Sequence, residues 1–144
     1  MKRWIKVYIN EWLEGSIRVD LTSAERGVWV DLLLLGGLSR NEGRIERSKG
    51  IPYEDDALVN KFEIDEKLLK STLEKCFKEG RLQRAKDGAL VITNWGKYQA
   101  VPDGKEPYLE DPRDRELRER KQTRVLTTKY PDEAEHKLES LKDD

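Results

Sequence analysis

A predicted helix that follows Asp65 and ends before Gly80 carries polar side chains able to bind an anionic polymer. At about 100° per residue, its apolar side chains fall on one side and most of its lysines on the other. Lysine ammonium groups bind phosphates or guanine edges, and a serine hydroxyl can contact either. The candidate residues on this polar side are Lys67, Lys70, Ser71 and Lys78, with Lys75 at its flank.

The same polar side has a second interpretation as a surface that only contacts water. Glu74 lies four residues from both Lys70 and Lys78. Such pairs stabilise a helix by about 0.2–0.5 kcal/mol each without any partner molecule. The composition of this helix favours the solvated surface, whereas the order of the elements around it favours contact with DNA. Both interpretations stay open from the sequence.

A β-hairpin is predicted next, because Asp87-Gly88 separates two strand-like runs, RLQRA and ALVITNW. Arg84 and Lys86 lie where such a hairpin would hold backbone phosphates, a contact that is independent of base sequence and sensitive to salt. The alternative is a polar hairpin whose charges face water. Trp95 could stack on a nucleobase, but we expect it to pack on the body of the domain and end the strand.

Residues with catalytic or metal-binding chemistry form no recognisable arrangement in this sequence. Cys76 falls on the apolar side of its helix, where a free cysteine behaves as a small hydrophobe. His136 has no partner pattern, and the acidic run Glu54-Asp55-Asp56 is explained by the dipole of a helix N-terminus. Phosphate loops and nucleophile elbows are absent. We therefore expect no enzymatic activity, no metal and no cofactor.

The composition limits the class of protein. The chain has 144 residues, 40% of them charged and 36% hydrophobic, with a net charge of −1. The charge fraction is well above the usual value of about 25%, so part of the chain is expected to pack poorly. One cysteine suits a reducing compartment, and no apolar run is long enough to span a bilayer. A cytoplasmic protein without membrane or small-molecule partners is expected.

Two regions are predicted. Residues 1–100 hold a docking arm, a helix, a short strand at 44–46, two helices joined by a turn of about three residues, and the hairpin. This order is that of a winged helix-turn-helix domain, an α+β and mainly helical fold. Residues 101–144 form a proline-rich and then charged tail with too few apolar residues for a core of its own. Helices are predicted within it at about 113–124 and 132–141.

Local signals set the ends of several elements. Thr22 and Glu25 form a capping box, so a helix is predicted to begin there. Gly36-Gly37 is expected to end that helix. Ile17, Val19 and Leu21 alternate with polar residues in a brief strand-like pattern.

Three stretches carry a resemblance to a known family. They read LTSAERGVWVDLLLLGGLSRNEGRI, GIPYEDDALVNKFEIDEKLLKSTLEKC and LVITNWGKYQ, in that order. Over about residues 3 to 99 they resemble the winged-helix N-terminal domain of phage replisome-organiser and DnaD-type replication initiation proteins. The resemblance implies binding to double-stranded origin DNA, self-association and recruitment of replication proteins. The charged tail is not expected to supply the further helical domain that members often carry.

The sequence thus favours a non-enzymatic protein that binds double-stranded DNA and assembles as a homo-oligomer, in replication initiation of a phage or mobile element. The expected DNA contacts are Lys67, Lys70, Ser71, Lys75, Lys78, Arg84 and Lys86. Two alternatives remain: an interaction and oligomerisation module without DNA binding, which Glu74 on the polar side favours, and a transcriptional regulator with the same fold.

Overall fold

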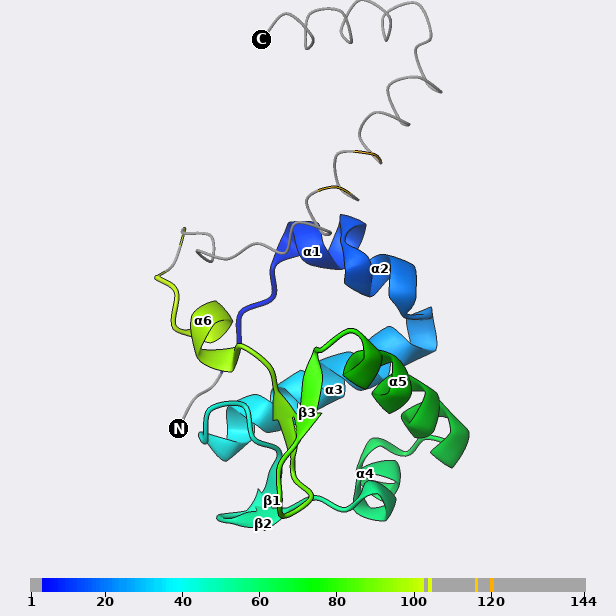
Figure 1. Cartoon of the computed structure of the whole chain (residues 1–144), viewed down its shortest axis with the longest axis vertical. Coiled ribbons are helices and arrows are strands. Elements are labelled where there is room, and N and C mark those ends of the chain that lie inside the picture. The colour runs from blue at the N-terminus through cyan, green and yellow to red at the C-terminus, as the bar shows by residue number, and fades with distance from the viewer. Residues whose placement is uncertain (1–3, 103, 105–115, 117–119, 121–144) are drawn as a thin grey trace, which may run out of the picture.

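Helices make up most of the described part of the chain, and two small antiparallel sheets complete it (Figure 1). This computed structural model describes residues 4–102, 104, 116 and 120. The predicted α+β, mainly helical fold class is confirmed. The helices are α1 (Ile9–Glu14), α2 (Ser16–Asp20), α3 (Ser23–Ser39), α4 (Asp55–Phe62), α5 (Glu66–Lys78) and α6 (Trp95–Gln99). The strands are β1 (Glu46–Ser48), β2 (Ile51–Pro52), β3 (Leu82–Arg84) and β4 (Leu90–Ile92).

The long helix α3 begins as its capping box predicts. The Thr22 hydroxyl accepts a hydrogen bond from the backbone N–H of Glu25 at 3.2 Å, and the Glu25 carboxylate accepts one from the N–H of Thr22 at 2.9 Å. Two of the four N–H groups left open at a helix start are thereby satisfied.

The predicted end of α3 at Gly36-Gly37 is wrong, because the helix continues to Ser39. Both glycines lie at close approaches. A Cβ on Gly36 would be 2.6 Å from Ile92 Cδ1 and 3.3 Å from Trp95, and one on Gly37 would be 2.7 Å from Ile5 Cγ2. These glycines let other elements pack directly on the helix backbone. In the sequence, a glycine pair with this packing role looks the same as a glycine pair that ends a helix.

Helices α4 and α5 are joined by a three-residue turn, as predicted. Glu63 adopts a left-handed conformation there, with φ 54°, and Asp65 is the N-cap residue of α5 but makes no side-chain capping bond. Gly80, with φ 74°, follows the end of α5 as expected. The core that holds α3, α5 and the strands together contains the fully buried Leu32, Ile45, Leu58, Leu69, Leu82 and Leu90.

The predicted hairpin is confirmed as β3 and β4, which pair from Leu82↔Ile92 to Arg84↔Leu90. The segment before β1 adds a third, partial strand on the other side of β4. There the N–H of Ile45 donates to the carbonyl of Leu90 at 2.8 Å, and the N–H of Ile92 donates to that of Gly43 at 2.9 Å. Strands β1 and β2 then form a second hairpin of their own.

The N-terminal arm docks on the domain, as the sequence predicts, and it does so through α6. Gln99 makes two hydrogen bonds to the backbone of Lys6, at 2.8 and 3.0 Å. The Tyr8 hydroxyl donates to the carbonyl of Tyr98, and the two rings meet edge to face at 5.6 Å. The strand-like pattern of residues 17–21 is misleading, because Ile17 and Val19 belong to helix α2.

The tail predictions fall mostly outside the described residues. Within the predicted helix at 113–124, Glu116 and Arg120 are described, are helical and form an ion pair four residues apart. The predicted helix at 132–141 lies wholly outside them. No helix among the described residues is long and apolar enough to cross a bilayer.

Candidate nucleic-acid interface

The outer face of α5 carries three of the predicted contact residues. Lys67, Lys70 and Lys78 are exposed, while Leu69 and Leu73 on the opposite face are buried in the core. Acidic residues share the outer face, since Glu66 and Glu74 are exposed as well. The predicted amphipathic division of this helix is therefore present, and its outer face is of mixed charge with a lysine excess.

Two other predicted residues of α5 face α3. The Lys75 ammonium lies 2.6 Å from the carboxylate of Glu25, whose side chain is 4% exposed. Ser71 is half-buried, donates to the carbonyl of Leu68 at 3.1 Å and also hydrogen-bonds Glu25. Both residues thus hold the junction of α3 and α5, and this role sets them apart from the exposed lysines.

The charge state of Glu25 follows from these contacts. Burial alone would raise the pKa of its carboxyl, but hydrogen bonds from Lys75, from the Thr22 backbone and from the Ser71 and Thr22 hydroxyls lower it to about 2. Hydrogen bonds to the charged form favour ionisation. Glu25 is therefore a buried carboxylate at neutral pH, satisfied from both helices. Its capping role was visible in the sequence, but its pairing with a residue 50 positions away was not.

The remaining predicted contacts lie on the β3–β4 hairpin. Lys86 is exposed at its turn. Arg84 is held more firmly: its guanidinium lies 3.5 Å from the carboxylate of Asp55, donates to the carbonyl of Gly88 at 3.0 Å and lies over the ring of Phe77 at 5.5 Å. Its side chain is still 38% exposed. Arg84 thus joins the hairpin to α4 and α5 while keeping one side open to solvent.

Arg44 lies in a basic segment before β1 that was not among the predicted DNA contacts, and the structure gives it a defined role. It forms a two-pronged ion pair with Asp87 at the hairpin turn and donates from Nε to Glu46 at 3.0 Å. Hydrogen bonds to Asp87 and Glu46 raise the pKa of this guanidinium, and those from Arg44 lower the pKa values of both carboxyls. Arg44 therefore fastens the start of the β1–β2 hairpin to the turn of the β3–β4 hairpin.

Trp95 packs on the body of the domain, as expected. Its ring lies against Gly36 and Gly37 of α3, and its Cβ would be 2.6 Å from a Cβ on Gly43. It begins α6 directly after β4 and is half-buried. Its position at the junction of α3 and the hairpin supports a packing role.

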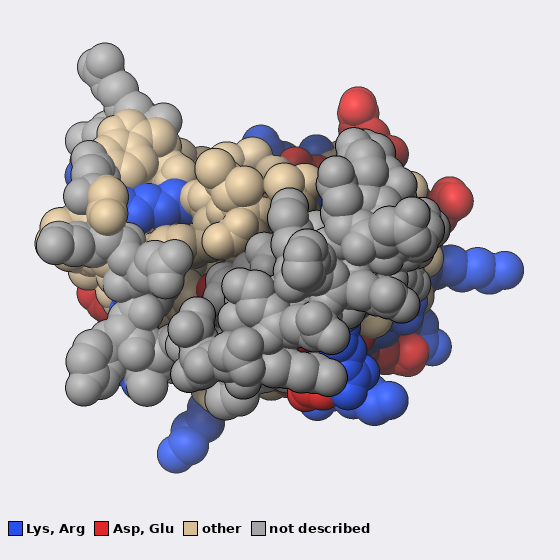
Figure 2. Space-filling view, turned by 90° about the horizontal axis from the view of Figure 1, so that it is seen from above, with Lys and Arg blue, Asp and Glu red and all other residues tan. Residues whose placement is uncertain are grey.

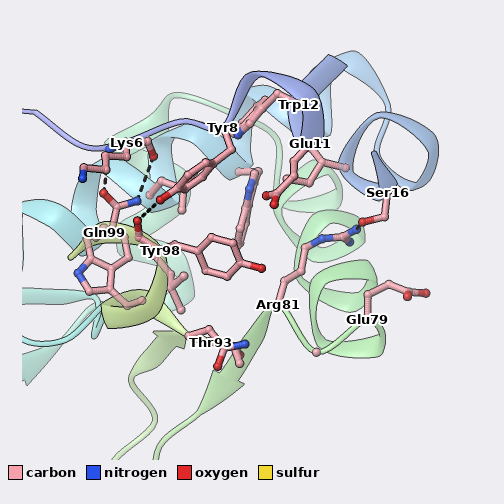
Figure 3. Close-up of a pocket in the computed structure, with 17 residues that line it drawn as sticks. Lys6, Tyr8, Glu11, Trp12, Ser16, Glu79, Arg81, Thr93, Tyr98 and Gln99 are labelled. Carbon is pink, nitrogen blue, oxygen red and sulfur yellow. Dashed lines mark hydrogen bonds between the residues drawn. The ribbon is translucent and has the colours of Figure 1, made fainter. Parts of the chain in front are cut away.

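A cleft of about 190 Å³ lies between α1, the C-terminal end of α5 and α6 (Figure 3). Arg81 reaches into it and binds Ser16 at 2.8 Å and Asp20 at 3.1 Å. Among the described residues, three buried polar atoms without a hydrogen-bond partner line this cleft: Trp29 Nε1, Arg81 Nη1 and Thr93 Oγ1. Such atoms are usually satisfied by ordered water. Side chains of both charges line the cleft: the basic Lys6 and Arg81, and the acidic Glu11 and Glu79.

The end of the domain that carries α1 shows charges of both signs among its visible described residues. Viewed from that side, basic and acidic side chains of the described residues alternate around the edge (Figure 2). The hairpin turns and α4 lie at the opposite end (Figure 1).

Catalytic chemistry finds little support in the described residues. They contain no group of three His, Cys, Asp or Glu side chains that could hold a metal ion. Cys76 is fully buried, as predicted, and burial raises the pKa of its thiol to about 12. It is therefore protonated at neutral pH and a poor nucleophile.

Comparison with known proteins identifies a family. The family described as the N-terminal phage replisome organiser matches residues 4–125. Searches of curated proteins and of solved structures return no match. The family match spans the arm, α3, both hairpins and α6, and confirms the resemblance drawn from the sequence. The chain therefore belongs to the N-terminal phage replisome organiser family, and this membership suggests a role in phage replication initiation.

Proposed function

We propose that residues 1–100 form a winged helix-turn-helix domain that binds double-stranded DNA during replication initiation, with residues 101–144 as an attached tail. The observation that carries this proposal is the exposure of Lys67 and Lys70 on the outer face of α5. Helix α5 is the second helix of a tightly joined pair and is followed by a hairpin. This is the element that enters the major groove in helix-turn-helix proteins.

The proposed contacts divide into two groups. The first group contacts DNA phosphates or base edges directly and consists of Lys67, Lys70, Lys78 and Lys86. Arg84 also contacts a phosphate beside the hairpin, through the exposed part of its side chain. The second group, Ser71 and Lys75, contributes to binding indirectly, because these residues hold α5 against α3 through Glu25. A fixed α5 can present its lysines without reordering, which lowers the free-energy cost of binding.

Affinity is expected to be modest for one copy of the chain. The net charge is −1, and Glu66 and Glu74 lie among the lysines of α5. Affinity for DNA rises with the number of phosphates neutralised. Two copies bound to adjacent half-sites would double these contacts, so we propose that the protein acts as a homo-oligomer.

Replacing both exposed lysines of α5 is expected to weaken DNA binding. In Lys67→Ala/Lys70→Ala, each lost phosphate contact makes the negative slope of log K against log salt less steep by about 0.9. We expect the dissociation constant for a duplex to rise roughly tenfold at low salt, which corresponds to about 1.4 kcal/mol. Fluorescence anisotropy with a labelled duplex across a salt series measures both quantities.

Lys97→Ala is the matched control, because Lys97 is equally exposed but lies on α6, away from α5 and the hairpin turns. It should leave affinity and slope unchanged. If the wild-type protein fails to bind duplex DNA at low salt, or the double variant binds as the wild type does, the proposed interface is wrong.

A second candidate function is an interaction module without DNA binding. The exposed acids on α5 favour it, as do large exposed apolar side chains: Trp4 is 60%, Leu34 51% and Leu38 61% exposed. Exposed apolar groups of this size can mark contact surfaces between proteins. Light scattering that shows a stable oligomer, together with no duplex binding at low salt, would select this function.

A further inference from the structure

The β1–β2 hairpin is a second projecting element, next to the β3–β4 hairpin that the sequence predicts. Its strands, Glu46–Ser48 and Ile51–Pro52, are joined through Lys49 and Gly50, and Gly50 has φ 78°. The hairpin leaves directly from the partial strand that pairs with β4. In Figure 1 it lies at the same end of the domain as the turn between β3 and β4.

The acidic residue of this hairpin is turned inward. The Glu46 side chain is 4% exposed, and its carboxylate accepts hydrogen bonds from Arg44 at 3.0 Å, Asn41 at 3.2 Å and the N–H of Gly50 at 2.9 Å. Its charge is therefore used to hold the hairpin in shape.

The cations left at the surface of the hairpin are Arg47 and Lys49. Both are exposed, and neither makes an ion pair within the part of the chain that the structure describes. Arg44 is different, because it is engaged by Glu46 and Asp87. The hairpin thus separates its charges into an inner, satisfied network and an outer pair of free cations.

The β3–β4 hairpin offers only one such cation at its turn. Between β3 and β4 the chain turns through Lys86, Asp87 and Gly88, closed by the bond from the N–H of Ala85 to the carbonyl of Ala89 at 2.8 Å. Asp87 is paired with Arg44, although its side chain stays 45% exposed, and Lys86 is the exposed cation of this turn. A single lysine gives little hold on a DNA backbone, since affinity depends on the number of phosphates contacted.

We propose that the β1–β2 hairpin is a second DNA-backbone contact, in which Arg47 and Lys49 bind phosphates next to the one held by Lys86. This inference rests on the proposed binding of duplex DNA. The ion pair between Arg44 and Asp87 holds the two hairpins together, so that three cations at one end of the domain, Arg47, Lys49 and Lys86, act as one surface. Because the contact is to phosphates, it adds affinity without sequence preference.

Removing both cations tests the proposal. In Arg47→Ala/Lys49→Ala, the negative slope of log K against log salt is expected to become less steep by about 1.8, which corresponds to two phosphate contacts. The loss of affinity should be the same for duplexes of unrelated sequence. Both side chains are exposed, so the thermal unfolding midpoint is expected to stay within error of the wild type. The charge-conserving exchange Arg47→Lys/Lys49→Arg should retain the wild-type slope.

The outcomes separate the two proposals. If Lys67→Ala/Lys70→Ala weakens binding while Arg47→Ala/Lys49→Ala leaves the salt slope unchanged, the second contact is overturned and the role of α5 stands. If only the hairpin variant loses affinity, the hairpin contact stands and the α5 interface falls. If the wild-type protein binds no duplex at low salt, both proposals fall together.

Discussion

Gly43→Ala is expected to destabilise the domain by at least about 2 kcal/mol. Gly43 has φ 81°, a conformation that side chains rarely adopt, and an added Cβ would lie 2.6 Å from Trp95 Cβ, 2.9 Å from Trp95 Cγ and 3.1 Å from the carbonyl oxygen of Ile92. The positive φ alone costs roughly 1 kcal/mol. Overpacking against such rigid neighbours typically adds about 1–3 kcal/mol. Urea unfolding followed by tryptophan fluorescence measures the change.

Gly50→Ala is the matched control for backbone strain. Gly50 has nearly the same dihedral, φ 78°, but no atom within 4 Å of the position that a Cβ would occupy. It should lose only the strain contribution, roughly 1 kcal/mol. Equal losses in the two variants would mean that Trp95 does not pack against Gly43 as the structure has it. The packing role assigned to Trp95 would then be wrong.

Features set by neighbouring residues were predictable from the sequence. The capping box of Thr22 and Glu25, the three-residue turn before α5, the left-handed Gly80 and the Asp87-Gly88 turn each depend on a few consecutive residues. Together they gave the order of elements from α3 to β4. The exposed side of α5 followed from its periodicity in the same way.

Features set by contacts between distant segments were not predictable. Gly36 and Gly37 resemble a helix stop until Trp95, some 60 positions later, is seen to pack on them. Lys75 resembles its neighbour Lys78 until Glu25 is seen at 2.6 Å. Each of these pairs joins segments that only the folded core brings together. A single sequence read for local patterns does not carry that information.

The family match adds a point about the extent of the domain. It continues to residue 125, past the boundary that the sequence analysis sets at residue 100. The proline-rich segment after α6 and the charged run that follows are therefore partly inside the matched region. We propose that residues 101–125 share in the function of the domain. Comparing the salt slopes of the full chain and of a chain ending at residue 100 would test this, once the shorter chain is shown to unfold cooperatively.

Glu25→Gln is expected to destabilise the protein by about 2 kcal/mol at pH 7. The substitution keeps a side chain that can reach the N–H of Thr22, but it removes the charge that Lys75 binds at 2.6 Å. Hydrogen bonds to buried charged groups contribute about 1.5–3 kcal/mol. Because the Lys75 side chain is 41% exposed, the loss in free energy of unfolding should be smaller than for a fully buried pair. Urea unfolding at pH 7 measures it.

The effect should depend on pH in one direction. The pKa of Glu25 is lowered in the folded protein from its ordinary value of 4.5 to about 2. A group with a lowered folded pKa contributes stability above its unfolded pKa, and that contribution is lost as the pH falls toward the folded value. The difference between the wild type and Glu25→Gln should therefore be full at pH 7 and shrink between pH 4.5 and pH 2. The wild type should lose stability over this range more steeply than the variant.

Glu74→Gln is the matched control, because it makes the same chemical change at an exposed site on α5. It should alter stability at pH 7 by no more than about 0.5 kcal/mol. A difference between Glu25→Gln and the wild type that stays constant from pH 7 to pH 2 would contradict the assignment of a buried, ionised Glu25. It would also remove the reason to place Lys75 at the junction of α3 and α5, and Lys75 would return to the set of candidate DNA contacts.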